Sequence, residues 1–380
     1  MNTASQAEQP VTTPPNSWKQ APHLREIVLL WITCGVCFVS TVVIFRHYWQ
    51  LVREFGDSAA YIEIADAIRF WNFSGIHVKH FWGLPYATAG LSFLIRIPNT
   101  QSLIVVSALS ALCAVFFAYR LWGGWIAALT LVLNMDWWQR SLLGGSEPLF
   151  VALLFASFLA IRKERWYRAS FLAALATICR PLGIFLLVGI AVALLLRHER
   201  RRFLGATCIG AFVGIVYALP LKIYLHDPLA TVHSYGVVPS ATYPALFGIP
   251  FKAIIVGTLL YPAPLTNLLL TFGWIFLVLA GNVAMFATRE FREYAKQHIS
   301  EAIFLALYLL SLYTYNAPAF ARGNFARFAI PIVPFVFLAL LRWLPKDRRL
   351  LWVLAPLTAI LSACSAIGLR SVITELHKIF

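Results

Sequence analysis

The residues with the clearest chemical potential form a short acidic motif, Asp57-Ser58-Ala59-Ala60-Tyr61, just after the first long apolar run at residues 27–45. The chain is otherwise poor in acid, with 16 Asp and Glu among 380 residues. An ionisable group where an apolar span meets water is a candidate functional residue. We expect partial desolvation there to raise the pKa of Asp57 and make it a better general base. The alternative is that Asp57 only caps a helix beginning at Ser58.

The composition places this motif in a membrane. The chain is 60% hydrophobic and 12% charged, with a mean hydropathy of +0.74, too apolar for an ordinary soluble domain. Apolar runs close to spanning length recur, and in lipid only helices satisfy the backbone of so many segments. We therefore expect an all-α fold, a polytopic transmembrane bundle of roughly nine to twelve spans, some short or re-entrant. Residues 1–26 are predicted to be a disordered cytoplasmic tail, and residues 27–380 a single membrane domain.

The net charge of +15 comes from basic stretches between apolar runs, so we expect no nucleic-acid partner. Four stretches, at residues 162–168, 197–202, 289–296 and 342–349, are predicted to be cytoplasmic loops. Alternation then places a first loop, 46–82, and a long loop, 220–252, on the external side. The ionisable residues mapped to that side are Asp57, His77, Lys79, His80, Glu147, His226, Asp227, His233, Arg322 and Arg327.

Three segments inside this topology carry separate expectations. Residues 58–70 are predicted to form an amphipathic helix along the membrane surface. Residues 83–95 are short and contain a proline, so we expect them to be re-entrant or interfacial. Arg180-Pro181 interrupts the apolar run 169–196, which either folds as a hairpin with Arg180 at its tip or is one kinked helix with Arg180 paired to an internal carboxylate such as Glu147.

Four motifs, in order over about three-quarters of the chain, resemble the C-type superfamily of membrane glycosyltransferases. Asp57-Ser58-Ala59-Ala60-Tyr61-Ile62-Glu63-Ile64-Ala65 is closest in form to the second GPI mannosyltransferase and its bacterial relatives that use polyprenyl-phosphate sugars. The other three are Phe81-Trp82-Gly83-Leu84-Pro85-Tyr86, Ser146-Glu147-Pro148-Leu149-Phe150 followed by Thr177-Ile178-Cys179-Arg180-Pro181-Leu182-Gly183, and Ala326-Arg327-Phe328-Ala329-Ile330-Pro331-Ile332-Val333-Pro334. The adjacent acids common in lipid A and protein O-mannosyl relatives are absent, because Ser58 follows Asp57.

The resemblance implies transfer of a hexose or mannose-like sugar, with inversion, from a polyprenyl-phosphate donor to a glycan, lipid or protein acceptor on the non-cytoplasmic face. Such transfer needs a base for the acceptor proton, for which we select Asp57, and cations for the departing phosphate. The predicted phosphate-binding residues are Lys79, Arg327, Arg180 and Arg322; each alone would equally suit a lipid headgroup. Tyr61, Glu147 and His80 are predicted to support the acceptor, although Glu147 at a helix start has an equally plain structural role.

Metal and cofactor use is left open. His77 and His80 are three residues apart, a spacing that invites a metal, but no firm carboxylate partner accompanies them. We therefore assign no metal ligand and no certain cofactor, and a divalent metal is not excluded.

Two other functions remain open. A transporter or flippase for a lipid-linked glycan would use the same Asp and Arg residues to bind without breaking bonds, and an inactive scaffold subunit is a third. The short external loops favour a bacterial inner membrane with a cytoplasmic N-terminus and an active site on the periplasmic face.

Overall fold

The computed structural model describes residues 24–47, 49–53, 55, 57–73, 76, 80–132, 134–236, 246–260, 265–318, 321 and 324–343. Within these ranges the fold is helical, which confirms the all-α class, and one isolated β-bridge joins Phe247 and Tyr315. Several expectations fall outside the described residues: most of the N-terminal tail, His77, Lys79, Arg322 and the last apolar run at 350–369.

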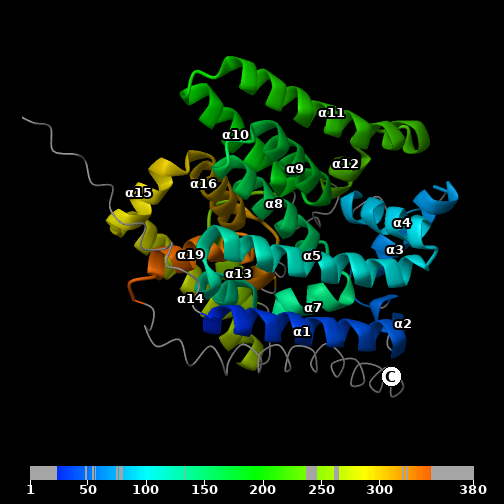
Figure 1. Ribbon diagram of the computed structural model, residues 1–380, viewed down its shortest axis with the longest axis horizontal. Helices are drawn as coiled ribbons and strands as arrows, with labels where there is room; N and C mark the ends of the chain where they lie inside the picture. The colour runs from blue at the N-terminus through cyan, green and yellow to red at the C-terminus, as the bar shows by residue number, and fades with distance from the viewer. Residues whose placement is uncertain are drawn as a thin grey trace, which may run out of the picture.

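The elements follow one another along the chain as in Figure 1. They are α1 (Leu24–His47), α2 (Trp49–Arg53), α3 (Ser58–Phe70), α4 (Gly83–Ile95), α5 (Asn99–Trp122), α6 (Gly124–Ala127), a π-helix (Ala128–Val132), α7 (Met135–Leu143), α8 (Glu147–Arg162), α9 (Trp166–Cys179), a 3-10 turn (Pro181–Gly183), α10 (Ile184–Leu196), α11 (Arg200–Leu225), α12 (Ala230–Gly236), α13 (Lys252–Leu260), α14 (Leu265–Ala287), α15 (Arg289–Gln297), α16 (Ile299–Thr314), α18 (Phe325–Ala329) and α19 (Val333–Leu340).

Two of the described helices, α5 and α11, are long and apolar enough to cross a membrane. The number rises to four if two bent pairs each count as one span: α7 with α8, bent by 106°, and α14 with α15, bent by 82°. Apolar side chains on the outside of α11, including Phe212 and Ile215, are 65% and 64% exposed. The expected nine to twelve spans remain a prediction.

The helices run between two chemically different ends. At one end, which we call the basic end, Arg162 at the close of α8 forms an ion pair with Glu301 near the start of α16. Arg197, after α10, lies there too, 3.6 Å from Glu164 and over the ring of Trp166. Tyr294, in the stretch 289–296, accepts a 2.7 Å hydrogen bond from Arg162, so three of the four basic stretches meet at one end of the bundle. The opposite end, to the right in Figure 1, contains α3, α4 and the last turn of α11.

Both alternatives for the Arg180 segment hold in part. α9 and α10 are separate helices joined by the 3-10 turn, and the residues that flank this pair, Glu164 and Arg197, touch at the basic end. The segment is therefore a hairpin with Arg180 at its tip. The expected partner is also correct, because Arg180 donates to Glu147.

The amphipathic helix predicted at 58–70 has the bounds of α3, and the short segment at 83–95 those of α4. α4 has 13 residues, about 20 Å at 1.5 Å per residue, so it cannot cross a bilayer alone. Arg69 of α3 donates to Ser92 of α4 and to the carbonyl of Ile97. α3 and α4 thus pack as a pair at the end of the bundle opposite the basic end, which we call the site end because the candidate site described below lies there.

Two predicted boundaries are wrong. The long external loop does not begin at Pro220, because α11 continues through it to Leu225. Leu221 is fully buried with Ile64 and Trp82, and this packing keeps the last turn helical despite the missing N–H of proline. The basic stretch at 289–296 is likewise a helix, α15, and not a loop.

Candidate active site

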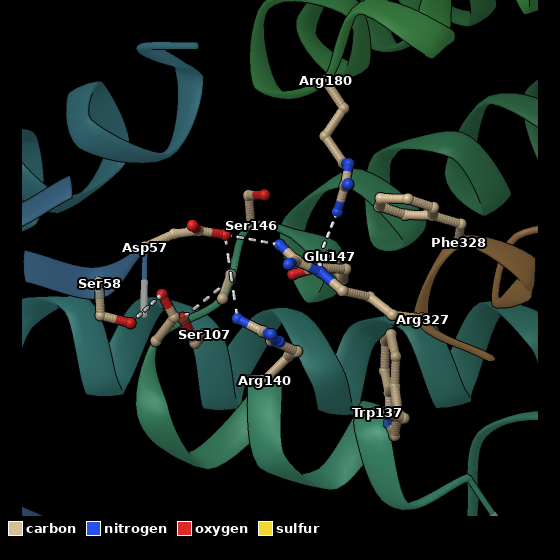
Figure 2. A network of polar contacts seen from close by, with 12 residues as sticks. Asp57, Ser58, Ser107, Trp137, Arg140, Ser146, Glu147, Arg180, Arg327 and Phe328 are labelled. Atoms are coloured by element: carbon tan, nitrogen blue, oxygen red, sulfur yellow. Dashed lines mark hydrogen bonds and ion pairs between the residues drawn. The ribbon is translucent and has the colours of Figure 1, made fainter. Parts of the chain in front are cut away.

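Asp57 lies between α2 and α3 and turns its side chain away from α3. It occupies the N-cap position, but its carboxylate makes no capping hydrogen bond. Instead Oδ2 accepts a 2.8 Å hydrogen bond from Nη2 of Arg327. The capping alternative is therefore wrong, and Asp57 belongs to an ionic cluster (Figure 2).

The next residue fixes the position of the acidic motif. The hydroxyl of Ser58 donates to the carbonyl of Leu143 at 2.7 Å and lies 3.2 Å from that of Gly144. These carbonyls end α7 and begin the sharp turn into α8. Ser58 thereby attaches the start of α3 to the turn that carries Glu147.

Two glycines make that turn. Gly144 has φ +90°, a left-handed conformation that side chains rarely adopt. Gly145 has ordinary φ, but a Cβ on it would lie 2.6 Å from Cβ of Arg140 and 2.6 Å from Oε2 of Glu147. The Gly144-Gly145 pair therefore lets two charged side chains approach the same backbone.

Glu147, the first residue of α8, holds two arginines together. Its side chain is 3% exposed, and Oε1 accepts from both Nη1 of Arg180 and Nε of Arg327. Its other oxygen, Oε2, is buried without a hydrogen-bond partner among the described residues. Glu147 is thus the anchor that brings the tip of the α9–α10 hairpin to α18.

Arg327 joins the two carboxylates. Nε contacts Glu147 and Nη2 contacts Asp57, so one guanidinium connects segments that are 180 and 270 residues away in the chain. Phe328 lies under both Arg180 and Arg327, with ring-to-guanidinium distances of 5.9 and 6.0 Å. Its carbonyl accepts a 2.8 Å hydrogen bond from Tyr308 of α16, which holds this short helix in place.

The sequence reasoning missed Arg140 of α7. Its Nη1 is 3.9 Å from the same Asp57 oxygen that Arg327 contacts, and its side chain is only 14% exposed. Arg140 lies in a short segment of mixed polar and apolar residues, Met135–Leu143, and no motif in that segment marks it as part of a site. Three arginines thus form ion pairs with two carboxylates. Asp136, four residues before Arg140 on the same helix, also interacts electrostatically with Arg140.

Two of the predicted supporting residues, Tyr61 and His80, lie close to Asp57. Tyr61 is buried, and its hydroxyl donates to Ser146 at 3.0 Å, beside Glu147. The ring of His80 stacks at a tilt against Tyr61, with centroids 5.1 Å apart. His80 also contributes to the electrostatic field at Asp57.

The pKa of Asp57 departs in the opposite direction from our expectation. Burial does raise it, but Arg327, by its charge and hydrogen bond, and then His80 and Arg140 together outweigh burial. The net result is a pKa below the ordinary value of a carboxyl group. Asp57 is therefore ionised at neutral pH, as a general base must be, but it is a weaker proton acceptor while Arg327 holds it.

Lys79 and Arg322 lie outside the described residues. Asp227 forms a separate exposed pair with His233 at α12, 2.7 Å apart, and this hydrogen bond lowers the pKa of Asp227. Among the described side chains, no group of three His, Cys, Asp or Glu residues is arranged to hold a metal ion.

No family model, curated protein or solved structure matches this chain.

Proposed function

We propose that this chain is an integral membrane glycosyltransferase that moves a sugar from a polyprenyl-phosphate donor to an acceptor on the non-cytoplasmic face. The observation that carries the proposal is the cluster of Asp57, Glu147, Arg180 and Arg327. It combines a partly exposed carboxylate, 32% accessible, with guanidinium groups suited to a phosphate. The two guanidinium groups of this cluster balance its two carboxylates, and Arg140, 3.9 Å from Asp57, adds a third positive charge that suits an anionic ligand.

The depth of the cluster supports a lipid donor. α8 has 16 residues and α9 has 14, so they are about 24 and 21 Å long. Both run from the basic end to the cluster, and both are shorter than the hydrocarbon core, which is about 30 Å thick. With the basic end at the cytoplasmic boundary and the two helices along the membrane normal, helices of this length would place the charged groups near the external boundary, where the phosphate of a polyprenyl lipid lies.

The basic end supports the orientation. Three basic stretches gather there, as the positive-inside rule describes for cytoplasmic loops, and the cluster lies at the other end. α3 and α4 lie beside the cluster, and large aromatic side chains near their C-terminal ends are exposed: Trp71 is 71% and Phe93 is 78% exposed. Aromatic residues of this kind are typical of the membrane–water boundary.

The proposed reaction breaks one bond and forms one. The acceptor hydroxyl attacks the anomeric carbon while Asp57 takes its proton, and the bond from that carbon to the phosphate oxygen breaks. The polyprenyl phosphate leaves with the electron pair, and Arg180 and Arg327 stabilise its added negative charge. Glu147 contacts neither reactant; it positions the two arginines. Displacement of this kind inverts the anomeric centre.

The test is transfer of radiolabelled sugar by purified protein in lipid nanodiscs, with a panel of polyprenyl-phosphate donors and with glycan, lipid and peptide acceptors. We expect label to leave the polyprenyl-phosphate fraction and to appear in an acceptor. If proteoliposomes move the labelled lipid between leaflets and no donor and acceptor pair gives transfer, the protein is a carrier and the proposal is wrong.

A further inference from the structure

Arg140 is a buried cation that the reaction described above does not use. Its Nη1 lies 3.9 Å from Oδ2 of Asp57, which is about 1 Å too long for a hydrogen bond. Its Nε is buried and has no hydrogen-bond partner among the described residues. The guanidinium lies 4.7 Å from the ring centroid of Phe55, which fixes its position by a cation–π contact. Arg140 therefore forms a long ion pair with Asp57 and no hydrogen bond to it.

A phosphate bound to Arg327 by two parallel hydrogen bonds would compete with the contacts that Arg327 now makes. Its Nε donates to Glu147 and its Nη2 to Asp57. Bidentate binding requires two neighbouring nitrogens on one edge of the guanidinium, and the edge that leaves Glu147 undisturbed consists of Nη1 and Nη2. Nη2 carries two N–H groups, so a phosphate at that edge shares this nitrogen with Asp57, and the repulsion between the two anions favours separation of Asp57 from Arg327.

Separating Asp57 from Arg327 would cost free energy unless another cation replaced Arg327. The carboxylate is mostly enclosed, and losing a charged partner in such a place is expensive. Of the described cations, Arg140 is the other one in an ion pair with Asp57, and it is aimed at the same oxygen. A shift of about 1 Å brings it to hydrogen-bond distance.

We propose that Arg140 is a positioning residue that takes over Asp57 when the donor phosphate draws Arg327 away. The exchange keeps the carboxylate ionised and correctly placed while Arg327 serves the leaving group. This inference rests on the proposed donor, because it needs a phosphate bound at Arg327.

The groups that act on Asp57 come from several elements. Arg327 belongs to α18, Arg140 to α7, Tyr61 to α3, and His80 precedes α4. Glu147 of α8 lies beyond Arg327 and acts mainly on the arginines. Replacing Arg140 or Arg327 therefore removes one of the two charges that exchange places beside Asp57, while the other charged groups around Asp57 stay the same.

The test reads the protonation of Asp57 directly, by infrared difference spectroscopy of the carboxyl band that disappears in Asp57→Asn. Arg140→Gln and Arg327→Gln are titrated in nanodiscs, with and without saturating polyprenyl phosphate. Arg120→Gln, an exposed arginine on α5, is the matched control. Without lipid, we expect Arg327→Gln to move the protonation midpoint of Asp57 to higher pH by more than Arg140→Gln does. With lipid, we expect the larger shift in Arg140→Gln.

Kinetics give a second readout that a purely structural role would not move. We expect Arg140→Gln to lower kcat by about tenfold to a hundredfold, with a smaller change in the donor KM, and Arg140→Lys to recover part of the loss. If the wild type transfers sugar but lipid does not reverse the order of the two shifts, the exchange is wrong and the proposed function stands. If the wild type binds no polyprenyl phosphate, both are wrong.

Discussion

Glu147→Gln separates the structural role of a buried glutamate from its role in the site, because the fold contains a second glutamate in a similar setting. Glu147 begins α8 and accepts from Arg180 and Arg327. Glu301, near the start of α16, is fully buried and accepts from Arg162 at 2.9 and 3.0 Å. Glutamine keeps the shape of each side chain but leaves the arginines without their counter-charge.

Both substitutions should lower the free energy of unfolding by about 3–5 kcal/mol, the usual cost of removing one partner of a buried ion pair. Their effects on transfer should differ. Glu147 orients the two arginines of the site, and a displacement of about 1 Å in such groups costs up to about a hundredfold in rate. Glu301 is at the opposite end of the bundle, so its loss should leave the activity of the folded molecules unchanged.

The assay measures unfolding in nanodiscs and the initial rate of transfer per folded molecule, each for the wild type, Glu147→Gln and Glu301→Gln. Expressing the rate per folded molecule removes the shared loss of stability. Equal rates in the two variants would refute the assignment of Glu147 as the anchor of the arginine pair. Unchanged stability in Glu301→Gln would refute the use of these pairs as matched controls.

Two further predictions concern the same cluster. Arg327→Gln removes the largest of the charges that lower the pKa of Asp57 while burial remains, so the acid limb of kcat/KM, which reports the free enzyme, should move to higher pH; a pH profile of kcat/KM with an unmoved limb would contradict this. Gly145→Ala places a methyl group 2.6 Å from Oε2 of Glu147 and should cost about 1–3 kcal/mol of stability. Gly214→Ala on α11 has no atom within 4 Å of the added Cβ and should be close to neutral, and similar unfolding of the two variants would show that the turn is not tightly packed.

The parts of the fold set by local pattern could be predicted from the sequence. The spacing of apolar residues on one helical face in 58–70 predicts α3 with its observed bounds, and Arg180-Pro181 marks the tip of a hairpin. The end of α11 could not be predicted in the same way. Pro220 is a local signal to stop, whereas the burial of Leu221 against α3 is a tertiary contact that overrides it.

Four residues of the site could be predicted from the sequence, but the direction of the pKa shift at Asp57 could not. Asp57, Glu147, Arg180 and Arg327 were all selected from the sequence, and the structure brings them together. The sign of the pKa shift at Asp57 was wrong because it depends on a partner 270 residues away. Arg140 was missed because the mixed polar and apolar segment that contains it, Met135–Leu143, has no motif or spacing that marks an arginine as part of a site.

The most direct test of the central claim compares Asp57→Asn with Asp227→Asn. Both aspartates lie at the site end of the bundle, but Asp227 forms an exposed pair with His233 outside the cluster. We predict that Asp57→Asn reduces transfer of radiolabelled sugar by about a hundredfold to ten-thousandfold, the range for loss of a general base, while polyprenyl-phosphate binding is retained. Asp227→Asn should transfer at the wild-type rate. Wild-type transfer by Asp57→Asn would contradict the assignment of Asp57 as the base and, with it, the proposed mechanism.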